Sequence, residues 1–178
     1  MTDSTKLTDM QRLYLLVGYP GAGKTTVSQL IKELTGAVHI WADHERKHQF
    51  INPRHDHAEN LKLYQYLNDK TDQLLKQGKS VIYDTNFNFY KDRQALRAIA
   101  DKYGVETIVI HLTTSAELAR QRAVHEDRDR PTRVLGNMTA DTFERIVNNL
   151  EPPRSDERTV EIDGHDVTLD LVRQALEP

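Results

Sequence analysis

The stretch Gly18-Tyr-Pro-Gly-Ala-Gly-Lys-Thr25 fits the pattern G-x-x-x-x-G-K-[ST] at every fixed position. Loops of this pattern bind phosphate groups, because glycine lets backbone N–H groups curl around an anion and leaves room for it. We expect Lys24 to reach the outer phosphates and the Thr25 hydroxyl to ligate Mg²⁺. The sequence therefore predicts a nucleoside triphosphate site with the candidate binding residues Gly18, Gly21, Ala22, Gly23, Lys24, Thr25 and Thr26.

The residues on either side of this stretch have the local patterns that such a loop requires. Residues 12–17 form a short apolar run typical of a strand, and apolar residues follow at helical spacing from Val27 to Leu34. Strand, glycine loop and helix is the expected order, and the helix N-terminus adds free N–H groups and partial positive charge. This context disfavours the alternative of a glycine-rich turn without a ligand.

Composition limits the class of protein. With 178 residues, 38% of them hydrophobic, the chain suits one compact domain, and we expect residues 1–11 to be flexible. The net charge of -3 gives no bulk attraction for nucleic acid, although a local basic groove stays possible. The absence of cysteine excludes disulfides and thiolate metal sites. No signal peptide or membrane-spanning run is present, so we expect a cytoplasmic protein without a membrane partner.

Strand-type and helical segments alternate along the rest of the chain. Further strands are predicted at 37–42, 80–84, 106–112 and 158–163. Helices are predicted at 56–77 (one long or two short), 90–103, 116 to about 124, 140–150 and 167–176. In the helix 90–103 the predicted inward residues are Ala95, Leu96, Ile99 and Ala100. This alternation predicts a parallel α/β sheet with right-handed crossovers.

Charged residues follow the second strand, at the edge where ligands of open α/β sheets bind. Asp43 comes directly after this strand, and Arg46 lies on the same face if a helix starts there. A carboxylate in this place can accept the proton of an attacking hydroxyl, and an arginine can hold a phosphate. The alternative is that Asp43 only caps a helix and that Arg46 is solvated.

The third strand ends in Val-Ile-Tyr-Asp84, an apolar run that closes on an acid as in a Walker B strand. Asp84 is therefore a candidate ligand of Mg²⁺, directly or through water. An aspartate that only forms a turn is the alternative.

Several arginines lie in the segment from about 120 to 137, which we predict to be a lid. Arginine offers fixed, planar donors for the charge that develops on a transferring phosphoryl group. Arg122 and Arg128 are the preferred candidates, although acidic residues interleave and a solvated face is the alternative.

The segment His44-Glu-Arg-Lys-His48 matches the zinc-hydrolase pattern H-E-x-x-H. It follows a strand by two residues, contains Arg and Lys, and lacks the further histidine of the metzincins, so we favour the nucleotide site. The chain contains no N-K-x-D guanine motif, which favours ATP.

With these residues the chain resembles the small phosphate-loop kinases related to the kinase domain of phage polynucleotide kinase, a group of AAA-type ATP-binding and zeta-toxin-like kinases. The resemblance runs from Leu13 to about Pro153. It rests on the glycine loop, on Asp43-x-x-Arg46, and on Val81-Ile-Tyr-Asp-Thr-Asn-Phe-Asn88 followed by an arginine-bearing helix. It implies a three-layer α/β/α P-loop NTPase fold with a mostly parallel sheet of about five strands and a helical lid.

The resemblance also implies roles for individual residues, with ATP and Mg²⁺ as cofactors. Asp43 is the implied general base on the acceptor hydroxyl, and Arg46 a contact to substrate or phosphate. Asp84 is implied beside the metal, and an arginine near Arg122 in the lid; which of Arg120, Arg122, Arg128 and Arg130 acts there stays open.

The predicted reaction is transfer of the terminal phosphoryl group of ATP to a hydroxyl of a small molecule, a nucleoside or a polynucleotide 5′ end. The acidic balance of the chain does not favour a nucleic-acid acceptor, although it allows one. The alternative is a P-loop ATPase or nucleotide-dependent switch that acts on a protein or RNA partner.

Overall fold

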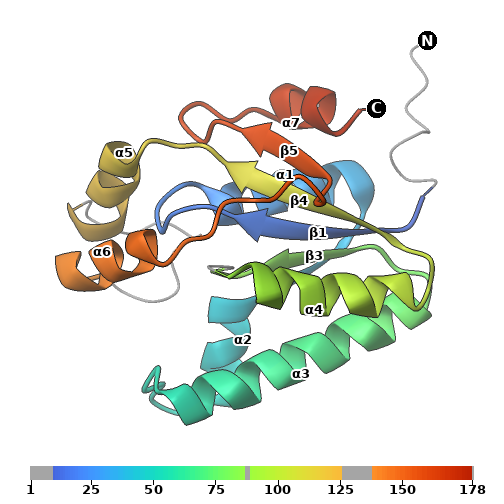
Figure 1. The fold of residues 1–178 in the computed structure, drawn as a ribbon, viewed down its shortest axis with the longest axis horizontal. Helices are drawn as coiled ribbons and strands as arrows, with labels where there is room; N and C mark the ends of the chain where they lie inside the picture. Colours follow the sequence, from blue (N-terminus) through green and yellow to red (C-terminus); the bar gives the residue numbers. More distant parts are fainter. Residues whose placement is uncertain (1–9, 87–88, 126–137, 178) are drawn as a thin grey trace.

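The computed structural model describes residues 10–86, 89–125 and 138–177 (Figure 1). Most of the predicted flexible N-terminus and of the predicted lid, including Arg128, lies outside these residues. The strands are β1 (Arg12–Val17), β2 (Val38–Trp41), β3 (Val81–Asp84), β4 (Glu106–Leu112) and β5 (Thr159–Ile162). The helices are α1 (Lys24–Thr35), α2 (Ala42–Gln49), α3 (His57–Lys76), α4 (Tyr90–Asp101), α5 (Ala116–Arg120), η1 (Gln121–His125), α6 (Ala140–Asn148) and α7 (Leu169–Leu176).

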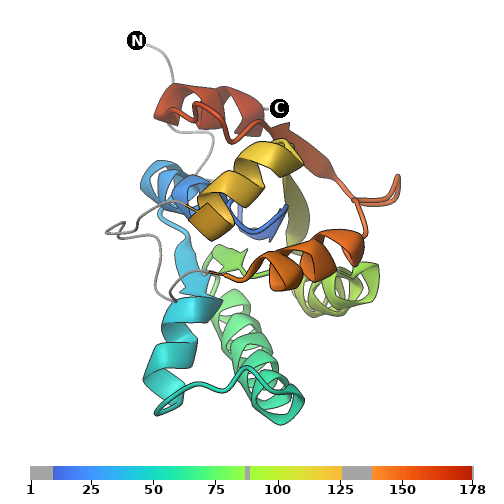
Figure 2. The ribbon, with the colours of Figure 1, turned by 90° about the vertical axis from the view of Figure 1, so that its left-hand side faces the viewer.

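The five strands form one sheet in the order β2-β3-β1-β4-β5, and all neighbouring pairs are parallel. The register places Trp41 beside Asp84, and Val17 beside His111. The carboxyl ends of the strands therefore meet at one edge, onto which Figure 2 looks. The helix after β1, α1, covers one face of the sheet, and the helix after the neighbouring β3, α4, covers the other. A topological switch point therefore lies between the carboxyl ends of β1 and β3, where α/β folds bind ligands.

Two hydrophobic cores separate three layers. Leu13 and Leu15 of β1 face one core with α3 and α4, whereas Tyr14 and Leu16 face the other with α1 and α7. This split follows from the two-residue period of a strand, which is buried on both faces here. Figure 1 shows α1 and α7 on one side of the sheet and α3 and α4 on the other. The predicted three-layer α/β/α fold with a parallel five-stranded sheet is confirmed.

Most predicted elements are found, with two refinements. The segment 56–77 forms a single helix, capped by the Asp56 carboxylate, which accepts from the Glu59 N–H. The helix after Ser115 ends at Arg120 and continues as one turn of π-helix, η1. None of the helices in the described ranges is long and apolar enough to cross a membrane.

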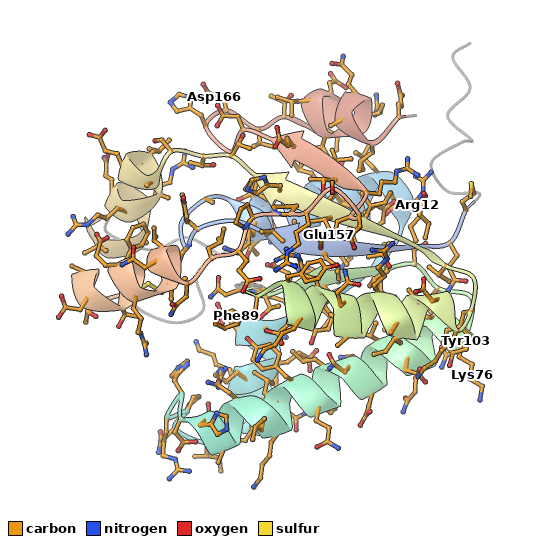
Figure 3. The ribbon with its side chains drawn as sticks, viewed as in Figure 1. Arg12, Lys76, Phe89, Tyr103, Glu157 and Asp166 are labelled. Atoms are coloured by element: carbon orange, nitrogen blue, oxygen red, sulfur yellow. The ribbon has the colours of Figure 1, made fainter. Side chains whose placement is uncertain are left out.

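One predicted core position is wrong: Ala95 is exposed, and Arg93 is buried in α4 instead. Arg93 is 1% exposed, and its Nε and Nη2 donate to the Glu157 carboxylate at 2.7 and 2.9 Å. It also donates to the carbonyl oxygens of Glu151 and Pro152. Because every nitrogen has a partner, a charged side chain occupies a core position; Figure 3 shows Glu157 between α4 and the sheet.

Candidate nucleotide and acceptor site

The phosphate loop between β1 and α1 is shaped by glycine backbone. Gly21 and Gly23 have φ values of 82° and 102°, which side-chain-bearing residues rarely adopt. A Cβ at Gly21 would lie 2.3 Å from the carbonyl oxygen of Ala119, so the loop also contacts α5 through this position. Within the loop, the Ala22 N–H donates to the Tyr19 carbonyl at 3.0 Å. The loop leads directly into α1 at Lys24, which places a helix N-terminus at the predicted phosphate site.

Lys24 folds back over the start of this loop. Its Nζ donates to the carbonyl oxygens of Gly18 and Tyr19 at 2.8 and 2.9 Å. Burial lowers the pKa of Lys24 from 10.5 to about 8, although the carboxylates of Asp84 and Asp43 act in the opposite direction. The structure therefore brings the predicted site residues Lys24, Asp43 and Asp84 together, although Lys24 and Asp84 are 60 positions apart in the sequence.

The two carboxylates lie at the carboxyl ends of the neighbouring strands β2 and β3. Asp84 ends β3, is 4% exposed and lies 3.0 Å from Nε2 of His39. Asp43 is half-buried in the first turn of α2, where Trp41 and not Asp43 occupies the N-cap position. Burial raises the pKa of Asp43, as does the nearby Asp84 charge, whereas Arg46 and Lys24 lower it. A carboxylate with a raised pKa is the better proton acceptor, as a general base requires.

The chemistry of the donor set fits Mg²⁺. Thr25 is half-buried in the first turn of α1 and offers a hydroxyl, and Asp84 offers a carboxylate. Hard oxygen donors of this kind suit Mg²⁺, which binds proteins through few side chains and keeps several waters or phosphate oxygens. Thr25 and Asp84 are the residues that could hold the ion.

Arg46 is buried, and its side chain bonds to two residues of α3. Its Nη1 forms an ion pair with Glu59, and its Nη2 donates to Asn60 Oδ1 at 2.7 Å. Glu59 also accepts the N–H groups of Arg54 and His55 at 2.7 and 3.3 Å. Burial raises the pKa of Glu59, but these hydrogen bonds and the Arg46 charge outweigh it, so the pKa is lowered. The terminal nitrogens of Arg46 join α2 to α3, and its contact to a phosphate stays a prediction.

Further side-chain pairs hold α2 and α3, which we call the helical pair (residues 42–49 and 57–76), in place. The Tyr64 hydroxyl lies 3.0 Å from Thr85 Oγ1, just beyond β3. Lys70 Nζ donates to Glu45 at 2.6 Å between the two helices. The sequence does not indicate Glu59 or Thr85 as site residues. No spacing pattern shows that Glu59 pairs with Arg46 or that Thr85 bonds to Tyr64.

Arg122 lies in η1 and contacts the loop after β5. Its Nη1 donates to the Gly164 carbonyl at 2.8 Å, and its Nη2 to the His165 carbonyl at 3.2 Å. Arg120 instead pairs with Glu144 of α6 on the surface. Single π-helical turns often occur at functional sites. Of the candidate lid arginines in the described residues, Arg122 is thus the one adjacent to the loop that borders the phosphate site.

His44 and His48, the histidines of the H-E-x-x-H match, are exposed on α2. Their Nε2 atoms lie 3.3 Å apart, and the His44 ring stacks on Trp41. Within the described part of the chain, no group of three histidine or acidic residues could hold a metal ion. The described residues therefore offer no complete ligand set for a hydrolytic zinc.

Comparison with protein families identifies the chain. A family model described as an AAA domain matches residues 13–153. The chain belongs to this AAA domain family. The comparison with curated proteins found no match.

Several solved structures are similar to this AAA domain protein over nearly its whole length. A sugar kinase from Janibacter sp. HTCC2649 is 21% identical, with a TM-score of 0.68 over 93% of this chain and 92% of that one. A shikimate kinase from Acinetobacter baumannii, in complex with shikimate, is 22% identical, with a TM-score of 0.64 over 98% and 95%. Chaetomium thermophilum Kti12 in complex with ADP-AlF3 is 18% identical, with a TM-score of 0.68 over 92% and 95%. These similarities show a shared P-loop NTPase fold.

Proposed function

We propose that this protein is a kinase that moves the terminal phosphoryl group of ATP to a hydroxyl of an acceptor. The observation that carries the proposal is the position of Asp43. It is a half-buried carboxylate with a raised pKa, within electrostatic reach of the phosphate-loop lysine, Lys24, and of Asp84. A nucleotide hydrolase or switch needs no such base for an acceptor, whereas phosphoryl transfer to a hydroxyl does.

Each residue then has a defined task. Asp43 accepts the proton of the acceptor hydroxyl, whose oxygen bonds to the terminal phosphorus as the bond to the ADP oxygen breaks. Lys24 and the loop N–H groups neutralise charge on the phosphates, so that most of the catalysis comes from positioning and electrostatics. Mg²⁺, held by Thr25 and Asp84, would supply further charge neutralisation at the phosphate oxygens.

We propose a small hydroxyl-bearing metabolite as the acceptor. The support is that the similar structures include a sugar kinase and a shikimate kinase with bound shikimate. A polynucleotide 5′-hydroxyl, suggested by the resemblance to phage polynucleotide kinase, ranks second because the chain carries a net charge of -3. The lid role of Arg122 and Arg128 stays a prediction, as does the phosphate contact of Arg46.

The test is transfer from terminally labelled ATP and Mg²⁺ to a panel of sugars, hydroxy acids, nucleosides, nucleotide-sugars and 5′-hydroxyl oligonucleotides. We expect label in one acceptor class, with little free phosphate in its absence. Label that appears only as free phosphate with every acceptor would contradict the proposal and favour an ATPase or nucleotide-dependent switch.

A further inference from the structure

Thr114, two residues after β4, joins two loops through a single buried hydroxyl. Thr114 is buried, with 2% of its surface exposed. Thr114 Oγ1 donates to the carbonyl oxygen of Ala22 in the phosphate loop at 2.8 Å. The same oxygen accepts the N–H of Gly164, in the loop after β5, at 3.0 Å. The hydroxyl therefore uses its proton for the phosphate loop and a lone pair for the second loop.

The second loop touches the phosphate loop at backbone distance. A Cβ at Gly164 would lie 2.0 Å from the Ala22 carbonyl oxygen and 2.4 Å from Thr114 Oγ1. Glycine is thus required for close approach, since both contacts are far shorter than any real Cβ makes. Figure 3 labels Asp166, which marks this loop beyond β5.

The Ala22 carbonyl matters because of peptide geometry. In a planar trans peptide the C=O and the following N–H point in opposite directions. Holding the Ala22 carbonyl therefore also fixes the direction of the Gly23 N–H, which belongs to the same peptide group. Gly23, which has a φ of 102°, has no Cβ, and glycine restrains its own backbone less than other residues do, so a hydrogen bond from outside the loop can set the direction of this peptide. Backbone N–H groups of such loops are the donors that hold phosphates.

Gly164 is held on its other peptide group by Arg122, whose Nη1 donates to the Gly164 carbonyl at 2.8 Å. A connected series of hydrogen bonds thus runs from Arg122 through Gly164 and Thr114 to Ala22. The two buried hydrogen bonds that share Thr114 Oγ1 polarise and strengthen one another. The series links η1, at the start of the predicted lid, to the backbone that would bind the anion.

We infer that Thr114 is a positioning residue for anion binding: its hydroxyl orients the Ala22–Gly23 peptide and ties it to Gly164 and Arg122. This inference deepens the proposed function and rests on it only in assuming that the loop binds phosphates. It does not depend on whether an acceptor is phosphorylated.

The experiment compares Thr114→Val, which keeps the shape and removes the hydroxyl, with Thr114→Ser, which keeps the hydroxyl. Thr71→Val is the matched control, because the Thr71 hydroxyl is equally buried and donates to the Leu67 carbonyl within α3. The probes are inorganic tripolyphosphate and Mg·ATP, titrated by calorimetry, with urea unfolding of each variant. We expect Thr114→Val to bind both about tenfold more weakly, and Thr114→Ser and Thr71→Val to bind them like the wild type.

Two results would overturn the inference. One is wild-type affinity for tripolyphosphate in Thr114→Val; the other is equal weakening in Thr114→Ser, which keeps the hydroxyl and would show that the weakening does not come from its loss. If Thr114→Val does not fold, Thr114→Ala removes the same hydroxyl and has the same expected outcome. Because tripolyphosphate binding is the readout, a wild-type chain that transfers no phosphoryl group would contradict the proposed function and leave this test intact.

Discussion

The phosphate loop and the helical pair hold their functional side chains by different means. The loop is made of contiguous residues, and its shape comes from glycine backbone and from the carbonyl oxygens that Lys24 contacts. The helical pair is held by side chains 13, 21 and 25 positions apart: Arg46 with Glu59, Tyr64 with Thr85, and Glu45 with Lys70. Local backbone thus builds most of the nucleotide side, with the long-range hydrogen bond from Thr114 to Ala22 added to it, whereas long-range polar pairs build the side that carries Asp43.

On the nucleotide side, the largest effect is expected from Lys24→Ala. Removing a buried ammonium group that lies within reach of Asp84 and Asp43 takes away the charge that stabilises the phosphates. We expect the rate of phosphoryl transfer to fall by roughly 10²–10³-fold, measured as initial rates with labelled ATP. Lys32→Ala, an exposed change in the last turn of the same helix, should leave the rate unchanged. Equal losses in both variants would contradict the role of Lys24.

The helical pair should respond to pH through Glu59. The lowered pKa of Glu59 means that its ionised carboxylate stabilises the fold at pH values above the usual pKa of a glutamate. This stability is lost as the pH falls through the folded-state pKa. Glu59→Gln should therefore lower the free energy of unfolding at pH 7, and the difference from wild type should shrink toward acid pH.

Urea unfolding over a pH series measures this difference. Glu33→Gln, on the exposed face of α1, is the matched control and should show none. A Glu59→Gln difference that stays constant over the whole pH range would show that shape, and not charge, holds Arg46. Tripolyphosphate affinity should change little in Glu59→Gln, because the loop does not depend on this ion pair.

A smaller effect is expected from Tyr64→Phe, which removes one hydroxyl between α3 and Thr85. The loss of this partly buried hydrogen bond should cost about 1 kcal/mol of the free energy of unfolding, measured by urea unfolding. Tyr66→Phe is the control, because Tyr66 is exposed on the same helix. Identical stability losses in the two variants would mean that the bond to Thr85 contributes nothing specific.

The contrast between the two regions also explains what the sequence could predict. The glycine pattern marks the phosphate loop, and strand periodicity places Asp43 and Asp84 at the same sheet edge, since parallel strands end together. The prediction that Ala95 faces the core is wrong, because Arg93 takes a core position of α4 instead. Apolar spacing does not show that Arg93 pairs with Glu157, which lies 64 positions further along the chain. No sequence pattern indicates Thr114 or Gly164 either, because the two residues contact each other only when the ends of β4 and β5 lie beside the phosphate loop.

The most direct test of the proposal is Asp43→Asn, which separates ATP binding by the phosphate loop from proton transfer by Asp43. ATP affinity and phosphoryl transfer are measured in the same preparation. The amide keeps the shape of the side chain and cannot accept the acceptor proton. We predict ATP affinity equal to or higher than wild type, since a negative charge near Lys24 is removed, and transfer slower by roughly 10²–10⁴-fold. Transfer at the wild-type rate would contradict Asp43 as the base and with it the kinase proposal.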